Sequence, residues 1–180
     1  GGRFGLQNLG DPGEKFSRDT FVSNAQLSMP ASDVEKISRI DGVQSAAGGL
    51  TLNSLHIEGT VPEQQPPQPG QFGGPGAGGG PPNNIDATSQ SVSGVVQTQE
   101  DLGAITPGQI IEGRYFGAGD ARQAILNEAY ASSEGLSVGA TVKLGGRTFT
   151  VIGIASTPLG GQSSDVYVKL ATLQSVADFA

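Results

Sequence analysis

The stretch from Leu126 to Ile154 constrains the fold of this chain more than any other segment. Asn127 can cap a short helix over Glu128–Glu134, and Gly135 would end this helix because glycine tolerates a positive φ. Gly145-Gly146 then predicts a hairpin, since such a pair readily takes the positive φ of a two-residue turn. The two strands of this hairpin are expected at Ala140–Leu144 and Arg147–Ile154.

Two elements are expected in the first quarter of the chain. Residues Thr20–Ser28 alternate in the pattern of a half-buried strand. A helix follows, with Ser32 as N-cap and Glu35 completing an S-x-x-E capping box. Gly42 is expected just past the end of this helix, as the left-handed residue that closes it. The apolar stripe of the helix consists of Val34, Ile37 and Ile40.

Short strands dominate the rest of the chain. Thr106–Gln109 has Pro and Gly at its two central positions, which predicts a type II turn. A polar, Gly-rich loop is expected over Thr157–Ser164. The apolar spacing of Leu170, Leu173, Val176 and Ala177 indicates a C-terminal amphipathic helix. The remaining strands are expected at Leu50–Glu58, Val92–Thr98, Ile110–Phe116, Arg122–Leu126 and Asp165–Val168. The predicted class is α+β, a mixed or antiparallel sheet with a few short helices packed on it.

One low-complexity segment interrupts this pattern, from Val61 to Asn84. Pro and Gly make up 14 of its 24 residues, so it buries too little apolar surface to offset its ordering entropy. Strand-like sequence lies on both sides of it. We therefore predict a single domain over residues 1–180, with residues 61–84 as a flexible, disordered insertion. A Pro-rich recognition site is the alternative, although Pro66–Pro69 lacks a basic flank.

Composition excludes several function classes. The formal net charge is −7 at pH 7, which disfavours nucleic acid because phosphate backbones are bound by clustered Lys and Arg. The chain has no cysteine, so disulfides, thiolate nucleophiles and Cys-type zinc sites are excluded. No apolar run approaches the roughly 20 residues that span a bilayer, and no signal peptide is visible.

Candidate catalytic residues are few. His56 is the only histidine, and it occupies an alternating run in which a solvated or hydrogen-bonded strand position is expected. A zinc site would need acidic partners in addition to this histidine, and we identify none near it in the sequence. No G-x-S-x-G elbow and no G-K-[ST] phosphate loop occur, and the acidic residues lack the spacing of a calcium loop. We predict no catalytic, cofactor-binding or metal-binding residue.

From about Ile105 to Ala177 the chain resembles the MacB-like periplasmic core domain of FtsX-like ABC transporter permeases. The matching pieces are Gly113–Phe116, Ala124–Ala131, Gly135–Gly139, Phe149–Ile154 and Ser164–Val168, and Asp33–Val43 also fits. Two features depart from the family pattern. Ala140 stands where the family usually has an acidic residue, and the family insertion is rarely as rich in Pro and Gly as residues 61–84. The first departure puts a local turn contact in doubt.

The resemblance implies a set of family-typical positions with structural roles. Glycines in this set would serve backbone geometry, and Asn127 would cap the short helix. The positions are Gly113, Phe116, Asn127, Gly135, Gly139, Gly153, Asp165 and Tyr167.

The resemblance also implies a function without catalysis. The domain would lie at the extracytoplasmic face of the cell membrane and transmit ATP-driven transmembrane motion to substrate export or to an extracytoplasmic partner. The implied partners are a second permease copy or paralogue, a cytoplasmic ATPase subunit or domain, and an extracytoplasmic protein or a lipid or peptide substrate. Family members usually continue past the last helix, so the chain is expected to be part of a larger ectodomain.

Two other functions stay open from the sequence. The first is a free-standing extracytoplasmic module for peptide or lipid binding or for adhesion, which predicts a sizeable apolar pocket. The second is an enzyme, which would require His56 to lie in a cleft beside an acidic residue and a nucleophile.

Overall fold

A computed structural model describes residues 11, 13–23, 29–61, 85–119, 122–157 and 163–178. These residues form eight strands, three short α-helices and one 3₁₀ turn, η2, which precedes the fourth strand. The strands are β1 Lys15–Val22, β2 Leu50–Thr60, β3 Ile85–Val95, β4 Ile110–Gly113, β5 Gln123–Asn127, β6 Thr141–Leu144, β7 Arg147–Ala155 and β8 Val166–Lys169. The helical segments are α1 Ala31–Ser38, η2 Pro107–Gln109, α2 Glu128–Glu134 and α3 Leu170–Val176.

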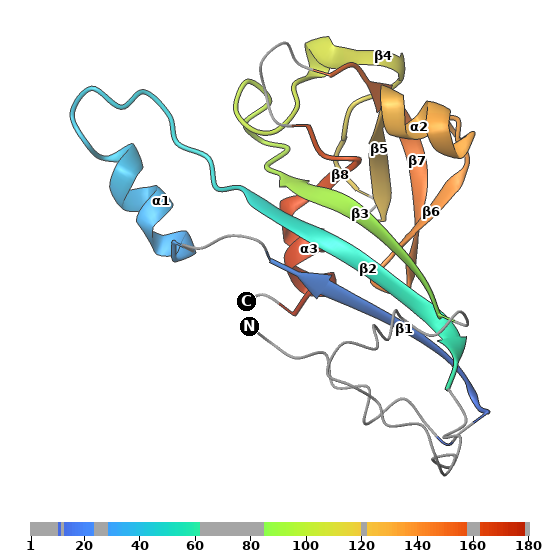
Figure 1. Cartoon of the computed structure of the whole chain (residues 1–180). Coiled ribbons are helices and arrows are strands. Elements are labelled where there is room, and N and C mark those ends of the chain that lie inside the picture. The colour runs from blue at the N-terminus through green and yellow to red at the C-terminus, as the bar shows by residue number, and fades with distance from the viewer. Residues whose placement is uncertain are drawn as a thin grey trace, which may run out of the picture.

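The strands form one mixed sheet in the order β1-β2-β3-β8-β5-β7-β4, with β6 paired to β7. The pairs β3–β8 and β5–β7 are parallel, and the others are antiparallel. Figure 1 shows β1, β2 and β3 as a long diagonal ribbon, beside which the shorter strands gather with α2. The predicted α+β class with a mixed sheet is confirmed.

Two hydrophobic cores lie on the two faces of the sheet. The first contains Leu52, Val92, Phe149, Val151 and Leu173, together with smaller side chains of β5, β6 and β8. The second is built on Val95, Ile105, Phe116, Ile125, Ile152, Ala155 and Tyr167. Strands β5 and β8 are buried at every position, as expected of strands covered on both faces.

Helix α3 packs close to the sheet because β3 has no side chain at the contact point. A Cβ atom on Gly94 would lie 2.8 Å from Leu170 Cδ1 and 3.0 Å from its Cα. Leu173 of α3 and Ala131 of α2 both enter the first core. The first core is therefore enclosed by α2, α3 and the β6 strand, whereas loop residues such as Ile105 and Phe116 cover the second.

The helix and hairpin predicted for Leu126–Ile154 are present with small shifts. Asn127 Oδ1 accepts a hydrogen bond from the Ala129 amide at 2.9 Å, and Gly135 ends α2 in the left-handed conformation. Gly145 and Gly146 have φ values of 54° and 71°, as the predicted two-residue turn requires. These signals are local in sequence, and the structure confirms them.

Strand boundaries decided by distant pairing were predicted less well. The strand expected at Thr20–Ser28 runs instead over Lys15–Val22, because those residues pair with Asn53–Thr60 of β2. Residues 24–28 lie outside the described part. The strand expected at Val92–Thr98 begins at Ile85, where Ile85 pairs with Gly59. β2 begins at Leu50 as predicted and continues to Thr60.

The predicted capping box of α1 is wrong. The helix begins at Ala31, with Pro30 as N-cap and no side-chain cap, so Ser32 lies inside the first turn. The helix ends at Ser38, and the chain continues in tight turns in which the amides of Arg39 and Ile40 donate to residues three positions earlier. Gly42 does have a positive φ of 89°, but in a later turn closed by Val43 and Ile40.

One turn and the boundaries of three strands also differ from the sequence predictions. The expected type II turn at Thr106–Gln109 is a 3₁₀ turn with a reciprocal Thr106–Gln109 capping box, and Gly108 is absent from the positive-φ glycines that a type II turn requires. β4 stops at Gly113 rather than Phe116, and β5 runs from Gln123 to Asn127. The last strand begins at Val166, one residue later than predicted, and the side chain of Asp165 before it accepts hydrogen bonds from Ser91.

Helix α1 stands clear of the sheet in Figure 1, to the left of the strands. It contains no buried residue. Its stripe residues Val34 and Ile37 are half-buried, whereas Ile40 is exposed, and Met29 beside the helix is exposed as well. The predicted apolar stripe thus exists but is only partly covered in the described part of the chain.

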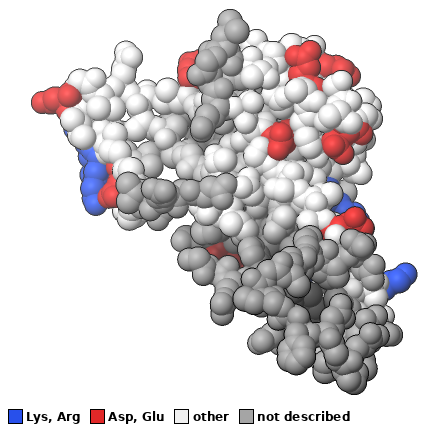
Figure 2. Space-filling model, viewed as in Figure 1, with Lys and Arg blue, Asp and Glu red and all other residues white. Residues whose placement is uncertain are grey.

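Charged side chains are sparse on the face shown in Figure 2. Acidic groups are spread over the region of β4 and α2, and basic groups are few and separated. Among the described residues, no helix has the length and apolar character needed to cross a bilayer. The insertion predicted over residues 61–84 lies outside the described part from residue 62 onward, as does the middle of the loop expected over Thr157–Ser164.

Candidate functional site

The single histidine lies on the exposed surface of the β1–β2 pair. His56 Nδ1 is 2.9 Å from Asp19 Oδ1 across the strands, and its Nε2 is 3.4 Å from Glu58 Oε2. The inference that no acidic residue lies near His56 in the sequence is wrong, because Glu58 is two positions away, and strand pairing also brings Asp19 from 37 positions away. The hydrogen bond to Asp19, followed by that to Glu58, raises the pKa of His56 above its usual value.

This trio does not form a catalytic or metal site. The His56 side chain is 36% exposed on a strand surface, and within the described part of the chain its ring nitrogens are hydrogen-bonded to the carboxylates of Asp19 and Glu58 rather than to a nucleophile. Within the described residues, no group of three His, Cys, Asp or Glu side chains is placed to hold a metal ion. Both ring nitrogens instead face carboxylates, which makes the trio a hydrogen-bonded surface cluster.

A polar junction joins the long strands to the short ones at the start of β8. We use this name for the side chains of Thr51, Ser91, Ser93, Asn127, Thr157, Ser164 and Asp165. Asp165 Oδ2 accepts from both the amide and the hydroxyl of Ser91 at 2.7 Å, and the Ser91 hydroxyl accepts from the Asp165 amide at 2.9 Å. A carboxylate held by two donors in this way is a strong, charge-assisted contact.

The polar junction continues through hydroxyl groups to β2. Ser93 Oγ lies 2.8 Å from Thr51 Oγ1 on the neighbouring strand and 2.7 Å from Ser164 Oγ. The Tyr167 hydroxyl accepts from the Ser164 amide at 3.1 Å. Ser93 and Ser164 are buried, so each hydroxyl needs these partners, because an unpaired buried polar group is costly.

The polar junction also reaches α2. The Asn127 amide donates to the Asp165 carbonyl at 2.9 Å, and its side-chain Nδ2 donates to Thr157 Oγ1 at 3.0 Å. Asn127 Oδ1 also caps α2. This single buried residue therefore connects the helix to the start of β8 and to the segment after β7.

Two predicted glycines lie in contact at the other edge of the sheet. Gly113 has a φ of 76°, and a Cβ atom there would collide with the Ile152 carbonyl and lie 2.9 Å from Gly153 Cα. A Cβ on Gly153 would lie 2.6 Å from the Arg114 carbonyl. Both positions therefore allow the edge strand β4 to lie tightly against β7 where the pairing shifts register.

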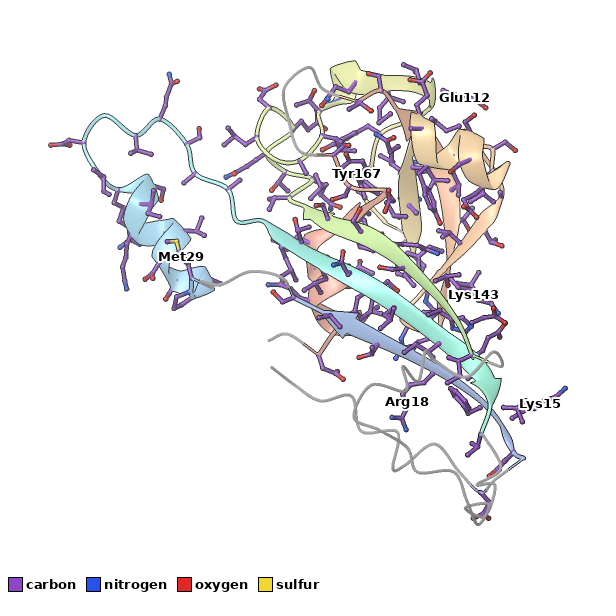
Figure 3. All side chains as sticks on the ribbon, in the orientation of Figure 1. Lys15, Arg18, Met29, Glu112, Lys143 and Tyr167 are labelled. Atoms are coloured by element: carbon purple, nitrogen blue, oxygen red, sulfur yellow. The ribbon has the colours of Figure 1, made fainter. Side chains whose placement is uncertain are left out.

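The remaining predicted positions have separate places. Phe116 and Tyr167 share the second core, and Tyr167 lies inside the molecule between β3 and β5 in Figure 3. Burial raises the pKa of the Tyr167 hydroxyl above its usual value. Gly139 has a φ of 92° in the connection between α2 and β6. The structure therefore brings Asn127, Asp165 and Tyr167 together, and Gly113 with Gly153.

Sequence reasoning missed the serines and the lysine that complete these contacts. Ser164 lies in a stretch with the composition of an ordinary loop, and Ser91 is separated from Asp165 by 74 positions. Lys169 is buried, and its Nζ donates to the carbonyls of Gly117 and Gly119 at 2.7 and 3.0 Å. The alternation Ser89, Ser91, Ser93 along β3 was the one local signal for a polar strand face.

A groove of about 360 Å³ opens beside α3. Arg122, Arg147, Ala171, Thr172, Ser175 and Val176 line it. Two guanidinium groups and two hydroxyls lie beside the apolar side chains of Ala171 and Val176, so this groove is mixed in character rather than the apolar pocket expected of a peptide-binding or lipid-binding module.

Comparison with known proteins identifies a matching family and a solved structure with a similar fold. The sequence profile described as the MacB-like periplasmic core domain matches residues 10–179. The crystal structure of the periplasmic region of MacB from Actinobacillus actinomycetemcomitans aligns with a TM-score of 0.51 and 18% identity, covering 88% of this chain and 67% of that one. At this identity the likeness shows the fold alone.

A second solved structure is more distant. A domain assigned to a permease protein from Porphyromonas gingivalis aligns with a TM-score of 0.38 and 15% identity, over 53% of this chain and 47% of that chain. No curated protein matches the chain.

Proposed function

Because this chain belongs to the family of MacB-like periplasmic core domains, we propose that it is a single extracytoplasmic domain that passes transmembrane motion to export or to an external partner. The observation that carries the proposal is the profile match over residues 10–179. The family consists of domains of ABC transporter permeases rather than enzymes, which supports an extracytoplasmic location for the chain. Its implied partners are a second permease copy or paralogue and a cytoplasmic ATPase.

The polar junction supports a role in transmitting motion. Movement passes between elements as rigid-body displacement when the elements are held by discrete, satisfied contacts. Here Ser91 and Asp165 join β3 to β8, and Asn127 joins β8 to α2. A displacement at the long β1–β3 strands would reach α2 through these bonds without a flexible segment between them.

The eight predicted positions have a common role in this proposal. Gly113, Gly153, Gly135 and Gly139 set backbone geometry, Phe116 and Tyr167 fill the second core, and Asn127 and Asp165 build the polar junction. We propose that they are framework positions of the family and that none of them contacts a substrate.

The location is tested by single-cysteine labelling of the full-length protein in intact cells. The chain has no cysteine, so Ser132→Cys on α2 introduces one unique exposed thiol into this domain. We expect a membrane-impermeant maleimide to label the variant without cell lysis, with the parent protein as control. Labelling that requires lysis would remove the extracytoplasmic assignment.

Transmission of motion is tested with spin labels at the same position in the full-length protein with its ATPase. Distances between labels in two copies are measured before and after trapping with ATP and vanadate. We expect a shift in the distance distribution, smaller in Asp165→Asn than in the control Asp33→Asn, whose carboxylate pairs with Lys36 within α1. An unchanged distribution would contradict mechanical transmission.

A further inference from the structure

The groove beside α3 gathers positive charge in a chain that is acidic overall. Its lining includes Arg122 and Arg147, whereas the formal net charge of the chain is −7. Within the described residues, neither guanidinium has a carboxylate partner, in contrast to Arg39 on α1, which pairs with Glu35. Two guanidinium groups without a described carboxylate partner can together donate hydrogen bonds to an anion in the groove.

The sheet topology explains why these two arginines meet. Arg122 immediately precedes β5, and Arg147 is the first residue of β7, which runs parallel to β5. Their strands are joined at this end by the Thr150 amide, which donates to the Arg122 carbonyl at 3.0 Å. Because side chains alternate along a strand, Arg147 shares a face with Phe149 and Val151 of the first core.

Helix α3 supplies the opposite wall of the groove. Ala171 and Ser175, and likewise Thr172 and Val176, are four positions apart and therefore lie on one helix face. This face presents two hydroxyl donors beside two small apolar side chains. The opposite face of α3 places Leu173 in the first core, so the groove-lining side chains have a fixed support.

We propose that this groove binds a phosphate group carried by a small ester or a lipid headgroup. Guanidinium forks donate paired hydrogen bonds to phosphate oxygens, and the hydroxyls of Thr172 and Ser175 add donors for the others. A carboxylate has only two oxygens for this many donors. The apolar walls at Ala171 and Val176 would contact the organic part, and a volume of about 360 Å³ is at the lower end of small-molecule sites.

The test is a titration of the 180-residue chain followed by ¹H–¹⁵N correlation spectra. Inorganic phosphate is added first and glycerol 3-phosphate second, at constant ionic strength. We expect saturable shifts in α3 and at the start of β7, with a Kd below about 1 mM for glycerol 3-phosphate. A flotation assay with phosphatidylglycerol vesicles distinguishes a lipid headgroup from a soluble ester.

The decisive variant is Arg122→Gln with Arg147→Gln, which removes both charges at exposed positions. We expect at least tenfold weaker binding. The control, Lys36→Gln with Arg39→Gln on α1, removes the same charge elsewhere and should change the Kd less than twofold. Thr172→Ala with Ser175→Ala should weaken binding severalfold, and circular dichroism checks that each variant is folded.

Specific outcomes overturn the proposal, which does not depend on the transport role. Shifts that do not saturate, or equal losses in the two charge variants, would mean that phosphate is attracted only by diffuse charge. Arg-dependent binding of glycerol 3-phosphate without vesicle binding supports a soluble ester. Arg-dependent flotation supports a lipid headgroup.

Discussion

At the scale of single residues, close backbone contacts in this domain depend on glycine, which has no side chain. Gly113 combines a φ of 76° with a carbonyl, that of Ile152, directly where a Cβ atom would project. Gly135 has a similar φ of 64° but no atom within 4 Å of its Cβ position. The pair therefore separates the cost of a left-handed conformation from the cost of a steric collision.

Gly113→Ala is expected to lower the free energy of unfolding by about 2–4 kcal/mol, because a collision adds to the left-handed penalty. Gly135→Ala is the matched control, with an expected loss of about 1–2 kcal/mol from conformation alone. Urea unfolding of the two variants measures the difference. Equal losses would mean that β4 shifts away from β7 without cost.

A second prediction at this scale concerns His56. Hydrogen bonds to Asp19 and Glu58 raise its pKa in the folded state, so protonation stabilises the fold. This contribution is complete below the unfolded pKa of about 6.5 and is lost as pH rises through the higher folded value. We expect stability to fall over this range in the parent chain and to fall less in His56→Gln.

The pH dependence is measured by urea unfolding at several pH values above about 5.5, where Asp and Glu stay ionised. An NMR titration of the His56 ring reports its pKa directly. Asp19→Asn should lower that pKa toward its usual value, and a pKa that stays raised in this variant would contradict the role of the Asp19 contact.

At the scale of elements, the tip of the β6–β7 hairpin docks onto the long strands. The Gly145 amide donates to Ser54 Oγ on β2 at 3.3 Å, and a Cβ at Gly145 would collide with the Phe21 ring of β1. A Cβ at Gly146 would lie 3.2 Å from Asp19 Oδ2. The hairpin thus crosses the first core and holds an edge strand that, among the described strands, otherwise pairs with β2 alone.

Phe21→Ala is expected to loosen β1 selectively. Phe21 is half-buried against the first core, so its truncation should cost about 1.5–3 kcal/mol, less than for a fully buried ring. Amide hydrogen exchange should become faster in β1 than in β5 or β8. Ile111→Ala, at a side chain that is 55% exposed on β4, is the control, and uniform exchange in both variants would contradict local docking.

The same elements show which parts of the fold can be predicted from sequence. Asn127, Gly135 and Gly145-Gly146 act on neighbours within a few positions, so α2 and the hairpin were predicted nearly in place. β1 and β3 were misplaced because their ends are set by pairing with β2, which is distant in sequence from β1 and separated from β3 by the insertion. Of the residues of the polar junction, the sequence singled out Asn127 as a helix cap and Asp165 as a family-typical position, but nothing local indicates that Ser91 faces Asp165.

At the scale of the whole molecule, the sheet is continuous across the predicted insertion. Gly59 of β2 pairs with Ile85 of β3, so the two chain ends that residues 62–84 connect are adjacent. Val61 also pairs with the segment before β1. Its amide donates to the Glu14 carbonyl and its carbonyl accepts from the Gly13 amide, both at 2.8 Å. A connection of a few residues can therefore close this hairpin without moving either strand.

Replacing residues 62–84 by five Gly and Ser residues should leave the fold intact and raise the free energy of unfolding by about 1 kcal/mol. The reason is that closing a roughly fivefold shorter loop costs less chain entropy. Urea unfolding measures the gain, and the hydrogen-exchange pattern of β2 and β3 serves as the control for unchanged pairing. A large loss of stability would show that the replaced residues contribute contacts of their own, and the description of this segment as a tolerated insertion would then be wrong.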